Sequence, residues 1–119
     1  MVTIKTYTDL KQSKVLSKIL SEESADMFWK NGASDKYIQC FTTFVRDDTN
    51  MDYDYDVPCW SLAALLGVLP HIQEFYPTLE KINNRYVCRY KNSGIWTNGI
   101  NSVDACVNMI IKLHELNLL

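Results

Sequence analysis

Long hydrophobic runs are missing from this sequence of 119 residues. The longest apolar run, Leu62 to Leu69, is only about eight residues long, whereas a helix needs about 20 to span a bilayer. Five charged side chains interrupt residues 1–20, so the unbroken apolar stretch of a signal peptide is absent there. We therefore expect a cytoplasmic protein without membrane contact.

Histidine and glycine are also scarce, with two and four copies respectively. Neither His71 nor His114 has a second His or Cys at the spacing of a metal site. The glycine-rich phosphate loops, the serine elbow and the zinc-protease motif are absent as well. The sequence thus indicates no catalytic residue, no cofactor-binding residue and no metal ligand, and we lean towards a non-enzymatic protein.

Neither sign of charge is in large excess, because twelve Lys and Arg residues face fourteen Asp and Glu residues, a formal charge of −2. This balance argues against a broad nucleic-acid-binding face but leaves room for a small basic patch. The apolar share of 47% and the charged share of 22% are ordinary for a globular chain. We expect one domain spanning residues 1–119.

The four cysteines stand singly, each in an apolar setting. They are Cys40, Cys59, Cys88 and Cys106. Structural zinc sites usually draw on closely spaced ligand pairs, and nothing in the sequence indicates export to a compartment that favours disulfides. Buried free thiols are therefore the favoured interpretation, ahead of a disulfide framework or a zinc site.

Hydrophobic periodicity predicts an α+β domain. We expect an antiparallel sheet of about four to five strands, with an N-terminal helix, a short central helix and a C-terminal helix packed on it. The predicted helices are Asp9–Leu20, Leu62–Leu69 and Val103–Leu116, with N-caps Thr8, Ser61 and Ser102. The predicted strands begin at Met27 and cover Tyr37–Val45, Thr78–Ile82, Arg85–Tyr90 and Ile95–Thr97, with turns at Asn83–Asn84 and Asn92–Gly94.

Two of these helices carry specific expectations. The central helix is apolar nearly all round, which is typical of a helix buried in the domain or covered by a partner. In the C-terminal helix, Cys106, Met109, Ile110 and Leu113 form an inward stripe.

The most polar stretch, residues 46–56, ends in alternating Asp and Tyr. Its candidate partner-binding residues are Asp52, Tyr53, Asp54, Tyr55 and Asp56. A calcium loop starting at Asp52 fails, because Val57 stands where Gly is required and Ala63 where Glu is required. Tyrosine is enriched at protein interfaces, so we interpret this segment as a solvated loop or a contact for a basic partner.

Two further groups of residues carry weaker hypotheses. Asp26 and Asp104 lie beside apolar segments and would be catalytic candidates if buried together, although capping alone explains Asp104. Trp96 lies near the basic residues Arg85, Arg89 and Lys91. Aromatic side chains on a sheet can stack single-stranded bases, so binding of single-stranded nucleic acid remains an alternative, although core packing explains most of the aromatics.

Three blocks of the sequence resemble a known family. They are Tyr7–Phe28 (YTDLKQSKVLSKILSEESADMF), Pro58–Leu66 (PCWSLAALL), and Val103–Cys106 (VDAC) continuing to Lys112–Leu116 (KLHEL). The family consists of small uncharacterised proteins of gut bacteria and their phage-like or mobile elements. It has no known activity, so the resemblance supplies no site residue. It implies a cytoplasmic accessory protein of mobile-element origin.

Taken together, the sequence favours a non-enzymatic protein-interaction or accessory module with an unidentified protein partner. A small enzyme or metal-dependent protein is the first alternative, and a single-stranded nucleic-acid binder is the second, although the net charge makes nucleic acid the less favoured partner. The apolar C-terminal end, Leu116, Leu118 and Leu119, would cover the core or form a homodimer contact.

Overall fold

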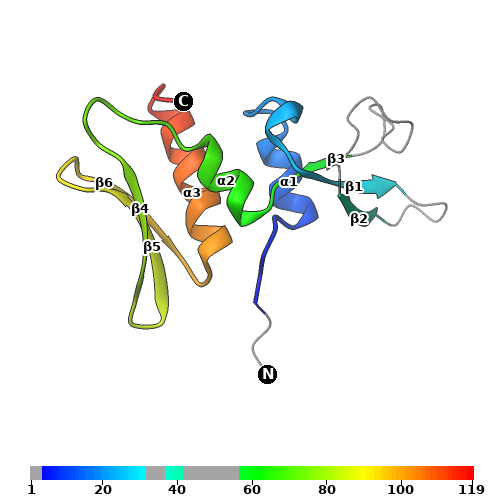
Figure 1. Ribbon diagram of the computed structural model, residues 1–119, viewed down its shortest axis with the longest axis horizontal. Helices are drawn as coiled ribbons and strands as arrows, with labels where there is room; N and C mark the ends of the chain where they lie inside the picture. The colour runs from blue at the N-terminus through cyan, green and yellow to red at the C-terminus, as the bar shows by residue number, and fades with distance from the viewer. Residues whose placement is uncertain (1–3, 32–36, 42–56) are drawn as a thin grey trace.

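The computed structural model describes residues 4–31, 37–41 and 57–119. Within these ranges the chain has an α+β fold with two antiparallel three-stranded sheets and three α-helices. Figure 1 shows the helices between the two sheets. The fold class predicted from the sequence is confirmed, but the single sheet of four to five strands is replaced by two separate sheets.

The first sheet has the strand order β2-β1-β3, with β1 at Met27–Asn31, β2 at Tyr37–Phe41 and β3 at Val57–Cys59. Strand β3 is not among the predicted strands, and it contains Pro58, which cannot donate a ladder hydrogen bond. Its place at the edge of the sheet resolves the conflict, since an edge strand can leave one side unpaired. Beyond β3, the backbone N–H of Thr8 donates to the carbonyl of Trp60 at 2.9 Å.

The second sheet, which we call the meander sheet, has the strand order β4-β5-β6. Strand β4 is Pro77–Ile82, β5 is Arg85–Tyr90 and β6 is Ile95–Gly99. Both predicted turns are confirmed by left-handed backbone conformations, with φ of 56° at Asn83, 64° at Asn92 and 79° at Gly94. Asn and Gly adopt these angles at low cost, so the sequence itself specifies the two hairpins.

The N-terminal helix α1 is Leu10–Leu16, shorter than the predicted Asp9–Leu20. Its N-cap is Asp9 rather than Thr8, and Asp9 forms a capping box with Gln12. Thr8 is buried instead, where its hydroxyl lies 2.7 Å from that of Ser13 and accepts from the backbone N–H of Trp60 at 3.1 Å. This contact ties the start of the chain to the end of β3, and a capping side chain could not make it.

The other two helices lie close to their predicted bounds. Helix α2 is Leu62–Val68 with Ser61 as N-cap, as expected. Helix α3 is Ser102–Glu115, but its cap is Asn101 instead of Ser102, because the Asn101 side chain accepts from the backbone N–H of Asp104 at 2.8 Å. The described chain does not bury α2 on all sides, since Leu66 is 42% exposed, so coverage of this helix by a partner stays a prediction.

The core lies between α3 and the meander sheet and extends to α2 and the residues around Trp60. All four residues of the predicted α3 stripe are buried in it. From the sheet side come Cys88 and Tyr90, which alternate along β5 with side chains of the opposite face. The C-terminal Leu116, Leu118 and Leu119 are exposed, so they do not cover this core. Helix α3 thus covers one face of the meander sheet.

Candidate functional site on the outer face of the meander sheet

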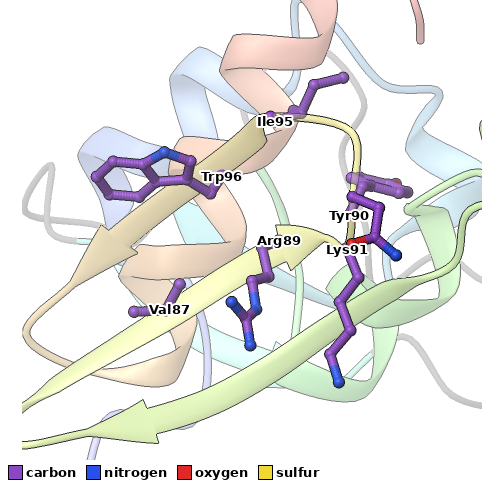
Figure 2. Close-up of a pocket in the computed structure, with 8 residues that line it drawn as sticks. Val87, Arg89, Tyr90, Lys91, Ile95 and Trp96 are labelled. Atoms are coloured by element: carbon purple, nitrogen blue, oxygen red, sulfur yellow. The ribbon is translucent and has the colours of Figure 1, made fainter.

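The face of the meander sheet that points away from α3 is the candidate site, and we call it the outer face. No helix or strand of residues 4–31, 37–41 and 57–119 packs on it. Figure 2 shows Val87, Arg89 and Trp96 on this side, with the helix behind the sheet. The outer face consists of Thr78, Glu80, Ile82, Arg85, Val87, Arg89, Trp96 and Asn98.

Strand register decides which of these side chains are neighbours. Arg89 in the central strand pairs with Trp96 on one side and with Thr78 on the other. Directly opposed residues of an antiparallel pair have Cβ atoms about 5 Å apart. The β5–β6 turn therefore brings a cation and an indole together from neighbouring strands.

Trp96 is the most unusual member of the outer face, because 53% of it is exposed. Trp60, by contrast, is fully buried in the core. Large aromatic side chains normally contribute buried area, so an exposed tryptophan on an uncovered sheet face makes this face a candidate for binding. The sequence already placed Trp96 and the neighbouring basic residues on one meander, but only the register shows their shared face.

A cavity of about 440 Å³ lies beside Trp96 at the end of the β5–β6 hairpin. Its lining includes Arg89, Lys91 and Asn92 together with Val87 and Ile95. This size is within the range of pockets that hold small ligands. The cavity offers an apolar wall, two cations and a side-chain amide to whatever lies against the indole.

The basic side chains of this region differ in how they are engaged. Arg89 donates to Glu80 from Nη2 at 2.8 Å and from Nε at 2.9 Å, and both side chains remain partly exposed. Arg85 hydrogen-bonds the Asn98 side chain. Lys91 makes no hydrogen bond or ion pair with a described residue. Lys91 is therefore available to an anionic ligand without giving up an existing partner.

Charge is distributed unevenly along the sequence. Residues 77–99 hold four Lys or Arg and one Asp or Glu, a local charge of +3 within a chain of net charge −2. The acidic excess lies elsewhere, mainly in residues 1–76. The meander sheet therefore carries a small basic patch, of the kind that the overall balance left open.

Hydrogen bonds from the inner side hold the outer face in place. The Tyr90 hydroxyl donates to the carbonyl of Pro70 at 2.7 Å, and Thr97 donates to the carbonyl of Ala105 at 2.9 Å. Lys112 of α3 reaches the carbonyl of Trp96 at 3.2 Å and adds a further positive charge beside β6. Because these contacts fix the strands, the outer face is a preformed surface.

Sequence reasoning missed two members of this arrangement, Glu80 and Lys112. Glu80 gave no signal of its own, since its role depends on pairing across the β4–β5 hairpin. Lys112 lies in the last turn of α3, where a cation is favourable for the helix dipole, so the sequence offers a sufficient reason for it without a site. Lys112 lies outside the inward stripe of α3, and this position was the signal in the sequence that its side chain reaches the surface beside the sheet.

The acidic segment Asp52–Asp56 lies outside the residues that the structure describes. The partner-binding hypothesis for its five candidate residues therefore stays a prediction.

Asp26 and Asp104 enter two separate hydrogen-bond networks. Asp26 accepts from the backbone N–H and the hydroxyl of Ser61, ahead of α2. Asp104 accepts from Lys5 at 2.9 Å and from Gln12 at 2.8 Å. Partial burial works to raise the pKa of Asp104, but the hydrogen bonds from Lys5 and Gln12 outweigh it and hold the pKa below its ordinary value. Both carboxylates thus connect parts of the fold.

The histidines and cysteines show no shared site within the described chain. His71 stacks edge-on against Tyr76, and His114 is exposed near the end of α3. Cys59, Cys88 and Cys106 are buried free thiols, whereas the side chain of Cys40 is outside the described part. A hydrogen bond with Cys88, followed by burial, raises the pKa of Cys106. No set of three His, Cys, Asp or Glu among the described residues is arranged to hold a metal ion.

Comparison of the chain with protein-family models, with curated proteins and with solved structures finds no match. None of the helices in the described ranges has the length and apolarity needed to cross a membrane. The argument for function therefore starts from the geometry of the outer face.

Proposed function

We propose that this chain is a non-enzymatic interaction module that binds an extended, negatively charged partner on the outer face of the meander sheet. The single observation that carries the proposal is the half-exposed indole of Trp96 directly opposite Arg89, beside the unpaired Lys91. Tryptophan and arginine are the residues that most often dominate binding energy at interfaces. The uncovered face runs across three strands beyond the cavity, so an extended partner can contact more of it than a compact small molecule can.

The state of the other polar residues supports binding over catalysis. Asp26 and Asp104 hold helix ends and the N-terminal segment in place through the contacts described above. The cations of the outer face, in contrast, are partly exposed at the surface. Charge at such a position increases the rate and specificity of association with a partner of opposite sign.

The test measures fluorescence anisotropy of two labelled polyanions, oligothymidylate and poly-glutamate, at low salt. We expect at least one of them to bind, and the double variant Arg85→Met/Lys91→Met to weaken that binding about ten-fold or more. Lys18→Met, which removes an exposed cation of the segment after α1, is the matched control and should bind like the wild type. Absence of binding to both polyanions, or equal binding by all three proteins, would overturn the proposal.

The accessory role in a mobile element, which the family resemblance implies, is part of the same proposal. So is a second contact through Asp52–Asp56, which would recognise a basic partner rather than an acidic one. Replacing Asp52, Asp54 and Asp56 with Asn distinguishes the two contacts experimentally, because this variant should still bind polyanions through the outer face.

A further inference from the structure

We infer that the partner of the outer face is single-stranded nucleic acid, with one base stacked on Trp96 and the phosphates of neighbouring nucleotides at Lys91 and Arg89. This inference rests on the proposed function, because it names the class of anionic partner that the same surface binds. Three independent features of the outer face support it.

The first feature is the position of the indole. Trp96 stands on β6 with more than half of its surface exposed, and it lines the adjacent cavity. A base stacked on an aromatic side chain contributes substantially to the affinity of single strands, and every base has a face suitable for stacking. An acidic peptide offers carboxylates to the cations but supplies no comparable flat ring for the indole.

The second feature is the line of positive charge along the central strand and its turn. Arg85 and Arg89 are four residues apart on β5, about 13 Å at 3.3 Å per residue, and Lys91 follows at the strand end. A strand that reaches from Lys91 to Arg85 therefore presents several phosphates to these cations. Phosphates along a single strand repeat regularly, which matches a row of cations better than one isolated charge does.

The third feature is the ion pair between Arg89 and Glu80. It draws the guanidinium towards β4 and away from the indole, so the face of Trp96 towards β5 is left to a ligand. A phosphate arriving at Arg89 must compete with the Glu80 carboxylate. Glu80 therefore acts as an internal competitor that limits the affinity of the outer face for anions.

The same geometry favours a single strand over a duplex. In a duplex the base faces are stacked on one another, so no base is free to lie on Trp96. The only exposed tryptophan of the described residues would then contribute nothing to binding. A splayed single strand can place one base in the cavity beside the indole while its backbone crosses β5.

The experiment titrates the full chain with labelled oligothymidylate of about 12 nucleotides, a length within the site sizes of single-strand-binding folds. We expect salt-dependent binding and quenching of tryptophan emission. Trp96→Ala should weaken binding about 5-fold to 150-fold and abolish the quenching, while Trp96→Phe keeps a ring and retains part of the affinity. Leu66→Ala, at an exposed position of α2, is the matched control and should change neither quantity.

Two charge variants separate stacking from phosphate contacts. Lys91→Met should reduce the steepness of log affinity against log salt by about 0.7, the contribution of one phosphate contact in a single strand. Trp96→Ala should leave that steepness unchanged. Glu80→Gln should tighten binding about two-fold to five-fold, because it releases Arg89 and removes a negative charge. Circular dichroism checks that each variant is folded.

The possible failures are distinguishable. Binding of poly-glutamate in preference to the oligonucleotide, binding of duplex in preference to single strand, or oligonucleotide binding that is unaffected by Trp96→Ala would each overturn the inference and leave the proposed function standing. Absence of binding to every polyanion by the folded wild-type chain would overturn both. Tighter binding by Glu80→Gln together with loss by Trp96→Ala is the expected result.

Discussion

The two faces of the meander sheet are built from alternate residues of the same strands, yet their environments are opposite. On the inner face, Cys88 and Tyr90 are buried against α3. On the outer face, Arg89 and Trp96 stand at the surface of the described structure. A one-residue step along a strand thus separates the protein's core from its candidate binding surface.

This difference indicates which residues the fold depends on. The inner face is shielded from water by packing against α3 and the rest of the core, so its side chains contribute to stability. The outer face gains little from folding, because its most prominent aromatic stays exposed. Its residues are therefore free to serve binding, and substitutions on the two faces should separate stability from function.

The largest expected effect is on the inner side, at Leu113 of α3, which is fully buried. Leu113→Ala removes apolar contacts and leaves a cavity, so we expect a loss of about 2–5 kcal/mol in the free energy of unfolding. Urea denaturation followed by circular dichroism measures it. Leu66→Ala is the control, and a similar loss there would mean that α2 is covered by something outside the described contacts.

The next effect concerns Gly99, the last residue of β6, which packs tightly against the start of α3. A Cβ at this position would lie 2.7 Å from the backbone nitrogen of Ala105, so the strand or the helix must shift. We expect Gly99→Ala to lower the free energy of unfolding by about 1–3 kcal/mol. Gly67→Ala in α2 is the matched control, since no heavy atom lies within 4 Å of the added Cβ. Ala favours a helix over Gly, so this variant should raise the free energy of unfolding by up to about 1 kcal/mol. Equal thermal midpoints for the two variants would contradict the close packing of β6 on α3.

Much of the meander sheet and α3 could be predicted from the sequence, because the signals there are local. Asn83, Asn92 and Gly94 mark the turns by their tolerance of positive φ, and the α3 stripe follows helical periodicity. The first sheet was harder, because β3 pairs with β1 across a long stretch of sequence and contains Pro58. Its pairing depends on tertiary contacts that no short segment encodes.

The candidate site was predictable only in part. Arg85, Arg89, Lys91 and Trp96 could be assigned to one meander, but the shared face of Arg85, Arg89 and Trp96 follows only from the strand register. The helix N-caps, too, could be predicted from the sequence only in part. Thr8 has the chemistry of an N-cap, yet its hydroxyl is taken by Ser13 and Trp60, and Asp9 caps the helix instead.

A smaller effect is expected where α1 and the N-terminal segment meet α3, at Asp104. Because its pKa is held below the ordinary value of 3.8, the carboxylate stabilises the fold above that pH, and this contribution is lost as pH falls through the folded-state pKa. Asp104→Asn removes charged hydrogen bonds to Lys5 and Gln12, so we expect a loss of about 1–2 kcal/mol at neutral pH. Unfolding curves from neutral pH to below 3.8 should converge for the two proteins at the acid end. A constant gap over that range would contradict the role of the charge.

The smallest expected effect on stability is that of Trp96→Ala on the outer face. Since 53% of this residue is exposed and α3 lies on the other side of the sheet, we expect the free energy of unfolding to fall by no more than about 1 kcal/mol, the size of strand-propensity and cross-strand pair effects. Urea denaturation of the isolated chain measures this directly. The equivalent change at buried Trp60 should cost about 3–5 kcal/mol, so the pair compares the same substitution in the core and at the surface. If Trp96→Ala instead destabilised the chain by several kcal/mol, the indole would be part of the packing that stabilises the fold. The main observation behind the proposed binding surface would then be explained without a partner.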